Sequence, residues 1–522
     1  MSTPAPPPSS FNLAEYLIAR NAERAARIAY VDDAGRMSYG DLATRTRRFA
    51  SVLRDRGLRR EERVLLLAHD SLDWPVAFLG AIDAGVVPVA ANTLLTPTDY
   101  AYMLSHSRAR AAIVSSALLP AFERAMEEGA NDVETVWVIG AAEGRRPQRR
   151  DFAADVGAAS EGAPARTHAD DVAFWLYSSG STGAPKGTVH THANAYWTDA
   201  LYAQNVLALS EDDVCFSAAK LFFAYGLGNA LTFPLSAGAT TVLMAERPTP
   251  QAVFKRLIER RVSVFYGVPT LYAAMLASSE LPKRGEVALR LCASAGEALP
   301  RDIGERFTAH FGCEILDGIG STEMLHIFLS NRPGSVQYGT TGIPVPGYDV
   351  ELRGEDGRTV ADGEIGDLYI RGPSAALMYW TDRDKTRATF QGEWTKSGDK
   401  YVRREDGYYV YSGRGDDMLK VSGLYVSPFE VEAALVQHPA VLEAAVIGKA
   451  DADDLTKTKA FVVLKQGHVA DAALEEALKA FVKDRLAPYK YPRYIEFISE
   501  LPKTATGKIQ RFRLREREQG RA

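Results

Sequence analysis

The sequence predicts an α/β fold, with a large N-terminal domain of layered α/β subdomains plus a β section and a small C-terminal α/β domain. Three observations support this prediction. The chain has 522 residues, and a single hydrophobic core stops growing well below that length. Short apolar runs alternate with longer amphipathic stretches, and the pattern changes near Gly342 and again near Gly413. We therefore expect one domain over residues 1–413, with residues 1–10 disordered, and another over residues 414–522.

The alternating part of the chain predicts mostly parallel strands with helices between them. Amphipathic patterns predict helices over residues 39–56 and 250–260. Short apolar runs predict strands at residues 64–68, 172–177, 262–266 and 289–293. Alternation of this kind is typical of α/β layers.

The last third of the chain has shorter elements. Gly-containing turns separate predicted antiparallel strands at residues 350–353, 364–371 and 407–411. After residue 418, Ser427 suits a helix N-cap, Pro428 the first helical position, and Glu430 the reciprocal position of a capping box. Strands are then expected at residues 444–448, 460–464 and 494–498, with a helix over residues 471–486.

Composition excludes several classes of function. The net charge of −5 is spread along the chain without a basic stripe, so we expect no nucleic-acid partner. Three cysteines without a C-x-x-C pair predict neither a disulfide framework nor a zinc site, and they suit a reducing cytoplasm. No run approaches the ~18–20 apolar residues that span a bilayer. The N-terminus lacks the basic and apolar parts of a signal peptide, so we expect a cytoplasmic protein without a membrane partner.

The most informative motif is the glycine-rich segment 177–187, with the sequence YSSGSTGAPKG after a predicted strand. Glycines let a backbone approach a polyphosphate closely, while hydroxyls, amides and a lysine can bind its oxygens. The segment is not a Walker A loop, because Pro185 occupies the sixth position counted from Gly180. The sequence thus predicts a phosphate-binding loop outside the P-loop class.

This segment resembles the signature of the adenylate-forming superfamily, which includes acyl-CoA synthetases, firefly-type luciferases and the adenylation domains of peptide synthetases. Further motifs follow in the family's order, and the resemblance covers nearly the whole chain. The family-like segments after the loop are residues 294–300, 317–323, 397–399, 413–423 and 501–508. Segment 294–300 also nearly matches a serine-hydrolase nucleophile elbow, but Cys292 stands in place of its first glycine.

The resemblance implies a role for each matching residue. Lys508, Thr322 and Glu323 are the implied catalytic residues: Lys508 stabilises charge between the carboxylate and the α-phosphate, and Thr322 contacts that phosphate. Glu323 and Thr182 are the implied Mg²⁺ ligands. The implied ATP- and AMP-binding residues are Ser178, Ser179, Gly180, Ser181, Thr182, Gly183, Lys186, Ser294, Ala295, Gly296, Glu297, Asp317, Gly318, Ile319, Gly320, Ser321, Asp399 and Arg414.

The resemblance also implies two half-reactions with ATP, Mg²⁺ and CoA. A carboxylate first attacks MgATP to give an acyl-adenylate and pyrophosphate, and the CoA thiolate then displaces AMP. In the family the mobile C-terminal lid domain rotates between these steps, which places the hinge near Asp416. Gly423 and Lys420 would then lie on the CoA side.

The residues implied for the acid pocket favour a flat ring. They are Phe223, Ala224, Tyr225, Gly318, His326 and Ile327. Ala224 stands where amino-acid-activating members often carry an aspartate. Aromatic side chains around small residues suit an aromatic acid. Segments 320–328 and 418–428 look like benzoate–CoA ligases in particular, so we expect benzoate or a small substituted benzoate.

Several alternatives stay open. A medium-chain fatty acid is the second choice of substrate, and a separate carrier protein is the second choice of acceptor. A luciferase-like oxygenase and a degenerate nucleotide-binding member are less favoured. His326 can contact the carboxylate or a ring substituent, or it can be a core histidine. The sequence leaves a homodimer open, and the context of Lys508 resembles that of ligases regulated by a lysine acetyltransferase.

Overall fold

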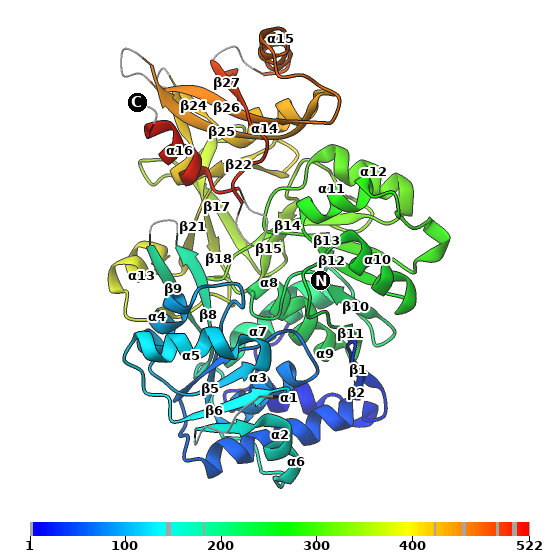
Figure 1. Cartoon of the computed structure of the whole chain (residues 1–522), viewed down its shortest axis with the longest axis vertical. Coiled ribbons are helices and arrows are strands. Elements are labelled where there is room, and N and C mark those ends of the chain that lie inside the picture. The colour runs from blue at the N-terminus through cyan, green and yellow to red at the C-terminus, as the bar shows by residue number, and fades with distance from the viewer. Residues whose placement is uncertain are drawn as a thin grey trace. The chain divides into compact units, whose positions relative to one another are not determined.

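The computed structural model describes residues 4–141, 148–180, 183–421, 424–451, 456–486, 490–503 and 509–520. The chain forms two compact units (Figure 1). Unit 1 comprises Met1–Val350 and Ile370–Lys396, and unit 2 comprises Glu351–Tyr369 and Ser397–Ala522. The predicted division after residue 413 falls inside unit 2, and it stays a prediction.

An eight-stranded sheet organises the first half of unit 1. Its middle strands are parallel, and antiparallel strands extend it at one edge. The predicted strands at 64–68 and 172–177 are confirmed as β3 and β8. In spatial order the sheet contains β19 (Met378–Tyr379), β9 (Gly183–Thr191), β8 (Val172–Gly180), β4 (Val87–Ala90), β3 (Arg63–Leu67), β5 (Ala109–Ser115), β6 (Thr135–Ile139) and β7 (Arg149–Asp151).

A nine-stranded sheet organises the second half of unit 1. Six of its strands form a parallel series, and antiparallel strands close both edges. The predicted strands at 262–266 and 289–293 are confirmed as β12 and β13, each shifted by about two residues. In spatial order the sheet contains β16 (Ile343–Pro344), β15 (Ile327–Ser330), β14 (Ile315–Gly320), β13 (Leu291–Ser294), β12 (Val264–Gly267), β10 (Val214–Ser217), β11 (Thr240–Val242), β1 (Ile28–Val31) and β2 (Arg36–Ser38).

The helices of unit 1 begin where the sequence supplies caps. Ser38 and Asp41 form a capping box at the start of the predicted helix 39–56, and Thr249 caps the predicted helix 250–260. The α-helices are α1 (Leu13–Ala19), α2 (Tyr39–Asp55), α3 (Asp73–Ala84), α4 (Pro97–Ser107), α5 (Leu119–Glu128), α6 (Phe152–Ala158), α7 (His192–Thr198), α8 (Ala224–Leu227), α9 (Phe233–Ala237), α10 (Pro250–Glu259), α11 (Pro269–Ala277), α12 (Arg301–Phe311) and α13 (Arg383–Thr389). Two π-helical turns, Asp199–Gln204 and Gly228–Thr232, adjoin α7 and α8.

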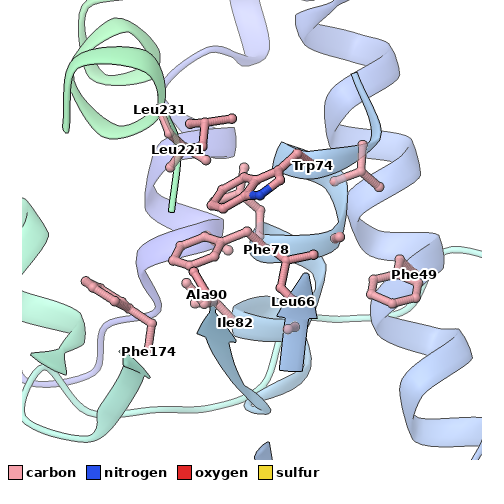
Figure 2. Packing of buried hydrophobic residues seen from close by; sticks show 14 of the residues in the cluster. Phe49, Leu66, Trp74, Phe78, Ile82, Ala90, Phe174, Leu221 and Leu231 are labelled. Atoms are coloured by element: carbon pink, nitrogen blue, oxygen red, sulfur yellow. The ribbon is translucent and has the colours of Figure 1, made fainter. Parts of the chain in front are cut away.

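The largest core cluster of unit 1 centres on helix α3. The rings of Trp74 and Phe78 stack with centroids 5.0 Å apart and planes 15° apart. Figure 2 shows these rings together with Phe49 of α2 and Phe174 of β8. Gly80 lets α2 approach α3 closely, because a Cβ there would lie 2.8 Å from Cδ1 of Phe49. This packing fixes β8, which leads into the glycine-rich segment.

Unit 2 contains the predicted C-terminal elements. Ser427 caps α14 (Pro428–Val436) as predicted, but Glu430 forms an ion pair with Lys490 at 2.7 Å in place of the reciprocal half of a capping box. Strands β25 (Val441–Ala450), β26 (Thr456–Leu464) and β27 (Tyr494–Phe497) form one sheet, as the sequence predicts. The other elements of this sequence region are β23 (Leu419–Val421), β24 (Leu424–Val426), α15 (Ala472–Lys483) and α16 (Arg511–Gln519).

The predicted β section is also present. Strands β20 (Phe390–Gln391), β21 (Trp394–Arg403) and β22 (Tyr409–Arg414) pair antiparallel. The same sheet includes β17 (Asp349–Arg353) and β18 (Ile365–Arg371).

The start of the chain makes defined contacts where the sequence predicts disorder: the Tyr196 hydroxyl donates to the carbonyl of Ala5 at 2.6 Å, and Ser10 forms a bridge with His168. Within the described ranges, the helices are too short or too polar for any of them to cross a membrane.

Replacing Phe78 with alanine should lower the free energy of unfolding by ~3–5 kcal/mol, because a buried ring stacked on Trp74 would leave a cavity. Urea denaturation followed by tryptophan fluorescence measures the change. Leu94→Ala is the control, because that side chain is 58% exposed and its loss should cost less than ~0.5 kcal/mol. Equal shifts in the two variants would contradict the assigned core.

Candidate active site

The glycine-rich segment is mainly a β-hairpin, although the sequence suggested a loop. Strand β8 continues to Gly180 and β9 starts at Gly183. The register places Ser178 opposite Lys186, with an irregularity between Ser178 and Gly180. Ser181 and Thr182 lie outside the described residues, and only the backbone is described at Ser179, Gly180 and Gly183. Opposed strands therefore hold Lys186 beside the tip of the hairpin.

The hairpin is held from its outer side by residues 376–380. The amide of Trp380 donates to the carbonyl of Gly187 at 2.8 Å, and the amide of Leu377 donates to Val189 at 2.9 Å. The Nζ atom of Lys186 lies 4.5 Å from the centre of the Tyr379 ring, within the range of a cation–π contact. Strand β9, which carries Lys186, is thus held at both edges, by β8 and by β19.

The predicted catalytic segment, which contains Thr322 and Glu323, lies against strand β9. Nε2 of His190 on β9 donates to the carbonyl of Thr322 at 2.9 Å. The amide of Ala376 donates to the carbonyl of Glu323 at 2.8 Å, and the Tyr379 hydroxyl donates to Oε1 of Glu323 at 2.6 Å. The structure therefore brings Lys186, Thr322 and Glu323 together in unit 1, while their predicted roles stay predictions.

The predicted adenine side joins this group through neighbouring parallel strands. Ser294 ends β13 and lies opposite Asp317 of β14 in the register. Gly296 has a φ of +93°, a conformation that favours glycine. The amide of Leu299 donates to Oδ2 of Asp317 at 3.3 Å, and burial raises the pKa of that carboxyl well above its usual range. The segments 294–300 and 317–323 thus occupy adjacent strand ends.

Glycines at the end of β14 bring the adenylate segment against the predicted acid pocket. A Cβ on Gly318 would lie 3.0 Å from Cγ2 of Ile327, and one on Gly320 would lie 2.5 Å from the carbonyl oxygen of His326. Strands β14 and β15 pair antiparallel here, with Gly320 opposite Ile327. Any larger residue at either glycine would force these two strands apart.

His326 is the residue around which the predicted acid-pocket residues gather. Its Nε2 lies 3.3 Å from the carbonyl oxygen of Tyr225, so this nitrogen carries the proton. Burial lowers the pKa of His326 to about 3, which keeps the imidazole neutral. Its Nδ1 is buried and has no hydrogen-bond partner among the residues that the structure describes. The ring therefore has a buried acceptor nitrogen and carries no positive charge.

Aromatic rings surround His326 on several sides. Tyr202 lies 5.5 Å, Tyr225 5.6 Å and Phe233 4.5 Å from its ring centre. Gly228 makes room for the histidine, since a Cβ there would lie 2.4 Å from its Cδ2. The other two predicted pocket residues, Phe223 and Ala224, lie at the start of α8 and are half-buried. The predicted pocket residues 225, 318, 326 and 327 therefore lie beside one another.

Several supporting residues were not predicted from the sequence. His190 is one of them, although its position three residues after Gly187 on the same strand is a usable signal. Tyr379 lies outside every quoted motif. Tyr202, Gly228 and Phe233 reach the pocket through the two π-helical turns and α9, which local periodicity does not predict. Fully buried His190 is also held neutral, because burial lowers its pKa to about 4.

The remaining predicted residues belong to unit 2. Asp399 on β21 lies opposite Arg414 on β22, and Oδ1 of the aspartate is 3.4 Å from Nη1 of the arginine. The amide of Asp399 donates to the Ser397 hydroxyl at 3.0 Å. Lys508 and Gly423 lie outside the described residues, and so do the side chains of Asp416 and Lys420. Their predicted roles therefore stay predictions.

Comparison with known proteins extends the observations to the whole chain. Residues 18–380 match the family described as AMP-binding enzyme, and residues 430–508 match the AMP-binding enzyme C-terminal domain. A benzoate–CoA ligase of Thauera aromatica is 58% identical over 513 residues, which cover 97% of this chain and 96% of that protein.

Solved structures agree with this result. Crystal structures of a benzoate CoA ligase from Burkholderia xenovorans LB400 match with a TM-score of 0.90 and 63% identity, covering 97% of this chain and all of that one. An anthranilate CoA ligase in complex with anthranoyl-AMP matches with a TM-score of 0.93 and 41% identity, covering 99% and 98% of the two chains.

Replacing Gly228 with alanine should lower the free energy of unfolding by ~1–3 kcal/mol and weaken the binding of an aromatic carboxylate, because the new Cβ would collide with His326. Chemical denaturation and isothermal titration measure the two effects. Gly285→Ala is the matched control, because a Cβ there meets nothing within 4 Å. Unchanged binding in Gly228→Ala would contradict the assigned pocket wall.

Proposed function

This chain belongs to the family of AMP-binding enzymes, and from that premise we propose that it is a benzoate–CoA ligase. The reaction joins benzoate to CoA, with cleavage of ATP to AMP and pyrophosphate, through a benzoyl-adenylate. High identity to benzoate–CoA ligases over nearly the full length supports this assignment.

One observation on the chain itself carries the proposal. The predicted adenylate strand, β14, pairs directly with the predicted acid-pocket strand, β15: Gly318 lies opposite Ser330, and Gly320 lies opposite Ile327 at the start of β15. An acid held by His326 and Ile327 would therefore have its carboxylate beside the phosphate-binding segment 320–323. Holding both reactants in one geometry removes much of the entropic barrier of the first step.

The wall of the pocket suits benzoate better than an amino acid. Ala224 supplies no carboxylate for an α-ammonium group, and the rings around His326 offer aromatic contacts to a flat substrate. Neutral His326 cannot pair as a cation with the substrate carboxylate. Its Nδ1 is an acceptor, so we propose that it faces a ring substituent that donates a hydrogen bond, such as an amino or hydroxyl group.

The residues near the hairpin fit an Mg²⁺ ion. Glu323 is a half-buried carboxylate with one oxygen fixed by Tyr379, and a second oxygen remains for a hard cation. Magnesium commonly takes one or two carboxylates together with substrate phosphate oxygens. We propose Glu323 and Thr182 as its protein ligands. When bound, the ion supplies positive charge against the phosphate oxygens of ATP.

The described side chains assist the first step in different ways. Lys186 can bind the β- and γ-phosphates that depart as pyrophosphate, and Thr322 is positioned through its carbonyl by His190. Asp399 is proposed to accept both ribose hydroxyls, with Arg414 contacting ATP. Placing fixed donors and charges where negative charge develops is the main contribution that a protein makes to such a transfer.

The second step is proposed to follow a rotation of the C-terminal domain about Asp416. Lys508 would serve adenylation, and Gly423 and Lys420 would then lie beside the CoA arm. This is a hinge-type transition.

We propose further that a lysine acetyltransferase can switch off adenylation by removing the charge of Lys508. We also propose that the enzyme works in the reducing cytoplasm, to which its free buried cysteines are suited. A homodimer stays a proposal.

Among carboxylic acids, benzoate should give the highest kcat/KM. Pyrophosphate release measured with benzoate, 2-aminobenzoate, cyclohexanecarboxylate and hexanoate provides the test. Cyclohexanecarboxylate is the matched control for ring flatness, and losing each aromatic contact, ~0.5–1.5 kcal/mol, should reduce kcat/KM about two- to twelvefold. A preference for hexanoate would favour the medium-chain fatty acid alternative. Pyrophosphate release without transfer to CoA would favour a carrier protein as the acceptor.

Lys508→Ala should lower benzoyl-adenylate formation at least about a hundredfold and spare thioesterification of supplied benzoyl-adenylate, because the lysine acts only in the first transition state. Asp416→Pro should show the reverse pattern. Rapid-quench assays of each half-reaction separate the two. Lys503→Ala is a nearby control, since its ammonium pairs with Glu443. Equal loss of both half-reactions in Lys508→Ala would refute its assigned role.

A further inference from the structure

Strand β19 presents one buried tyrosine to the candidate active site. Tyr379 lies opposite Thr188 in the register between β19 and β9, and its side chain is 3% exposed. Its own amide donates to the Thr386 hydroxyl at 3.0 Å. Backbone bonds on either side, from Leu377 to Val189 and from Trp380 to Gly187, prevent the strand from sliding. The position of this tyrosine is therefore fixed by the main chain.

Two oppositely charged residues contact this tyrosine through different groups. The ammonium of Lys186 lies 4.5 Å from the ring centre, and the hydroxyl donates to Oε1 of Glu323 at 2.6 Å. Among the residues that the structure describes, Lys186 and Glu323 form no ion pair with each other. A neutral side chain thus engages a cation and an anion that would otherwise attract one another.

We propose that Tyr379 is a positioning residue that keeps Lys186 and Glu323 apart, so that the lysine is available to the phosphates and the carboxylate to Mg²⁺. The inference rests on the proposed function for the identity of these ligands. Tyr379 itself is not proposed to touch the substrate or the ion. It acts through the two residues that do.

The physical reason lies in the competition between the two charges. An ion pair between Lys186 and Glu323 would neutralise both groups, and the substrate would then have to break that pair before binding. A hydrogen bond to a charged acceptor is among the stronger ones in proteins, and it directs the carboxylate without neutralising it. The ring holds the ammonium by its quadrupole, which also leaves the charge unneutralised.

The backbone contacts around Glu323 strengthen the inference. The amide of Ala376 donates to the carbonyl of Glu323 at 2.8 Å, three residues before Tyr379 on the same segment. The segment therefore holds both the main chain and the carboxylate of Glu323, while its other edge is joined to the strand that carries Lys186. A tyrosine in this place sets the separation between the two charged groups.

Tyr379→Phe tests the proposal because it removes only the hydroxyl. The Mg²⁺ concentration that gives half-maximal ATP binding should rise about tenfold, which corresponds to one lost hydrogen bond to a charged group. Isothermal titration of ATP without benzoate or CoA measures this, and ATP binding in EDTA should stay unchanged, because the phenylalanine ring keeps the contact that holds Lys186. The Mg²⁺ dependence of benzoate-driven pyrophosphate release should shift by the same factor.

Tyr39→Phe is the matched control. It also removes a buried hydroxyl that donates at 2.6 Å, but its acceptor is the carbonyl of Ala239. This variant should leave the Mg²⁺ dependence unchanged. Circular dichroism of both variants fixes a temperature at which each is folded, and all titrations are made there.

A double-mutant cycle with Glu323→Gln separates positioning from a general structural effect. Tyr379→Phe should have little further effect on Mg²⁺-dependent ATP binding in the Glu323→Gln background, because the group that it positions is already altered. Equal effects in both backgrounds, or an unchanged Mg²⁺ dependence in Tyr379→Phe, would overturn the proposal. Failure of the wild type to release pyrophosphate with any carboxylic acid would instead refute the proposed function.

Discussion

The pairing of strand β9 with its neighbours is the constraint on which the candidate active site depends. One edge of β9 pairs with β8 and so connects the hairpin to the main core. The other edge pairs with β19, and the His190 side chain reaches the carbonyl of Thr322. Without this strand, Lys186, Thr322 and Glu323 would have no common support. A small shift in its register would move the lysine to the other face.

A second constraint is the close approach of β14 to β15. Gly318 and Gly320 have no side chains, so the two strands can pack closely, and the predicted adenylate segment lies directly beside the predicted acid-pocket residues. The same device appears at Gly228, which leaves room for His326. In each place the absence of a Cβ leaves room for a neighbouring residue. Substituting the glycine would therefore displace that neighbour.

Burial also determines the charge of the site. His190 and His326 are enclosed and stay neutral, because desolvation lowers their pKa values to about 4 and about 3. They can therefore direct hydrogen bonds near neutral pH without adding positive charge to the site at which Mg²⁺ and ATP are proposed to bind. Positive charge is left to Lys186, which lies half-buried beside the hairpin tip, and to residues supplied by the rest of the chain.

The sequence alone determined the fold class, the helix and strand positions to within a few residues, and the order of the motifs. These depend on local periodicity, capping residues and spacing, which a linear sequence records directly. The family resemblance also predicted Tyr225, His326 and Ile327 as pocket residues, and the structure places Tyr225 and Ile327 next to His326.

Only the tertiary structure decided which residues hold the predicted site residues in place. His190 and Thr322 are 132 residues apart in the sequence, and Tyr379 and Glu323 are 56 apart, so neither contact leaves a local pattern. The protonation state of His326 likewise depends on the surrounding rings, because burial sets the free-energy cost of charging an imidazole. That burial comes from residues distant in the chain.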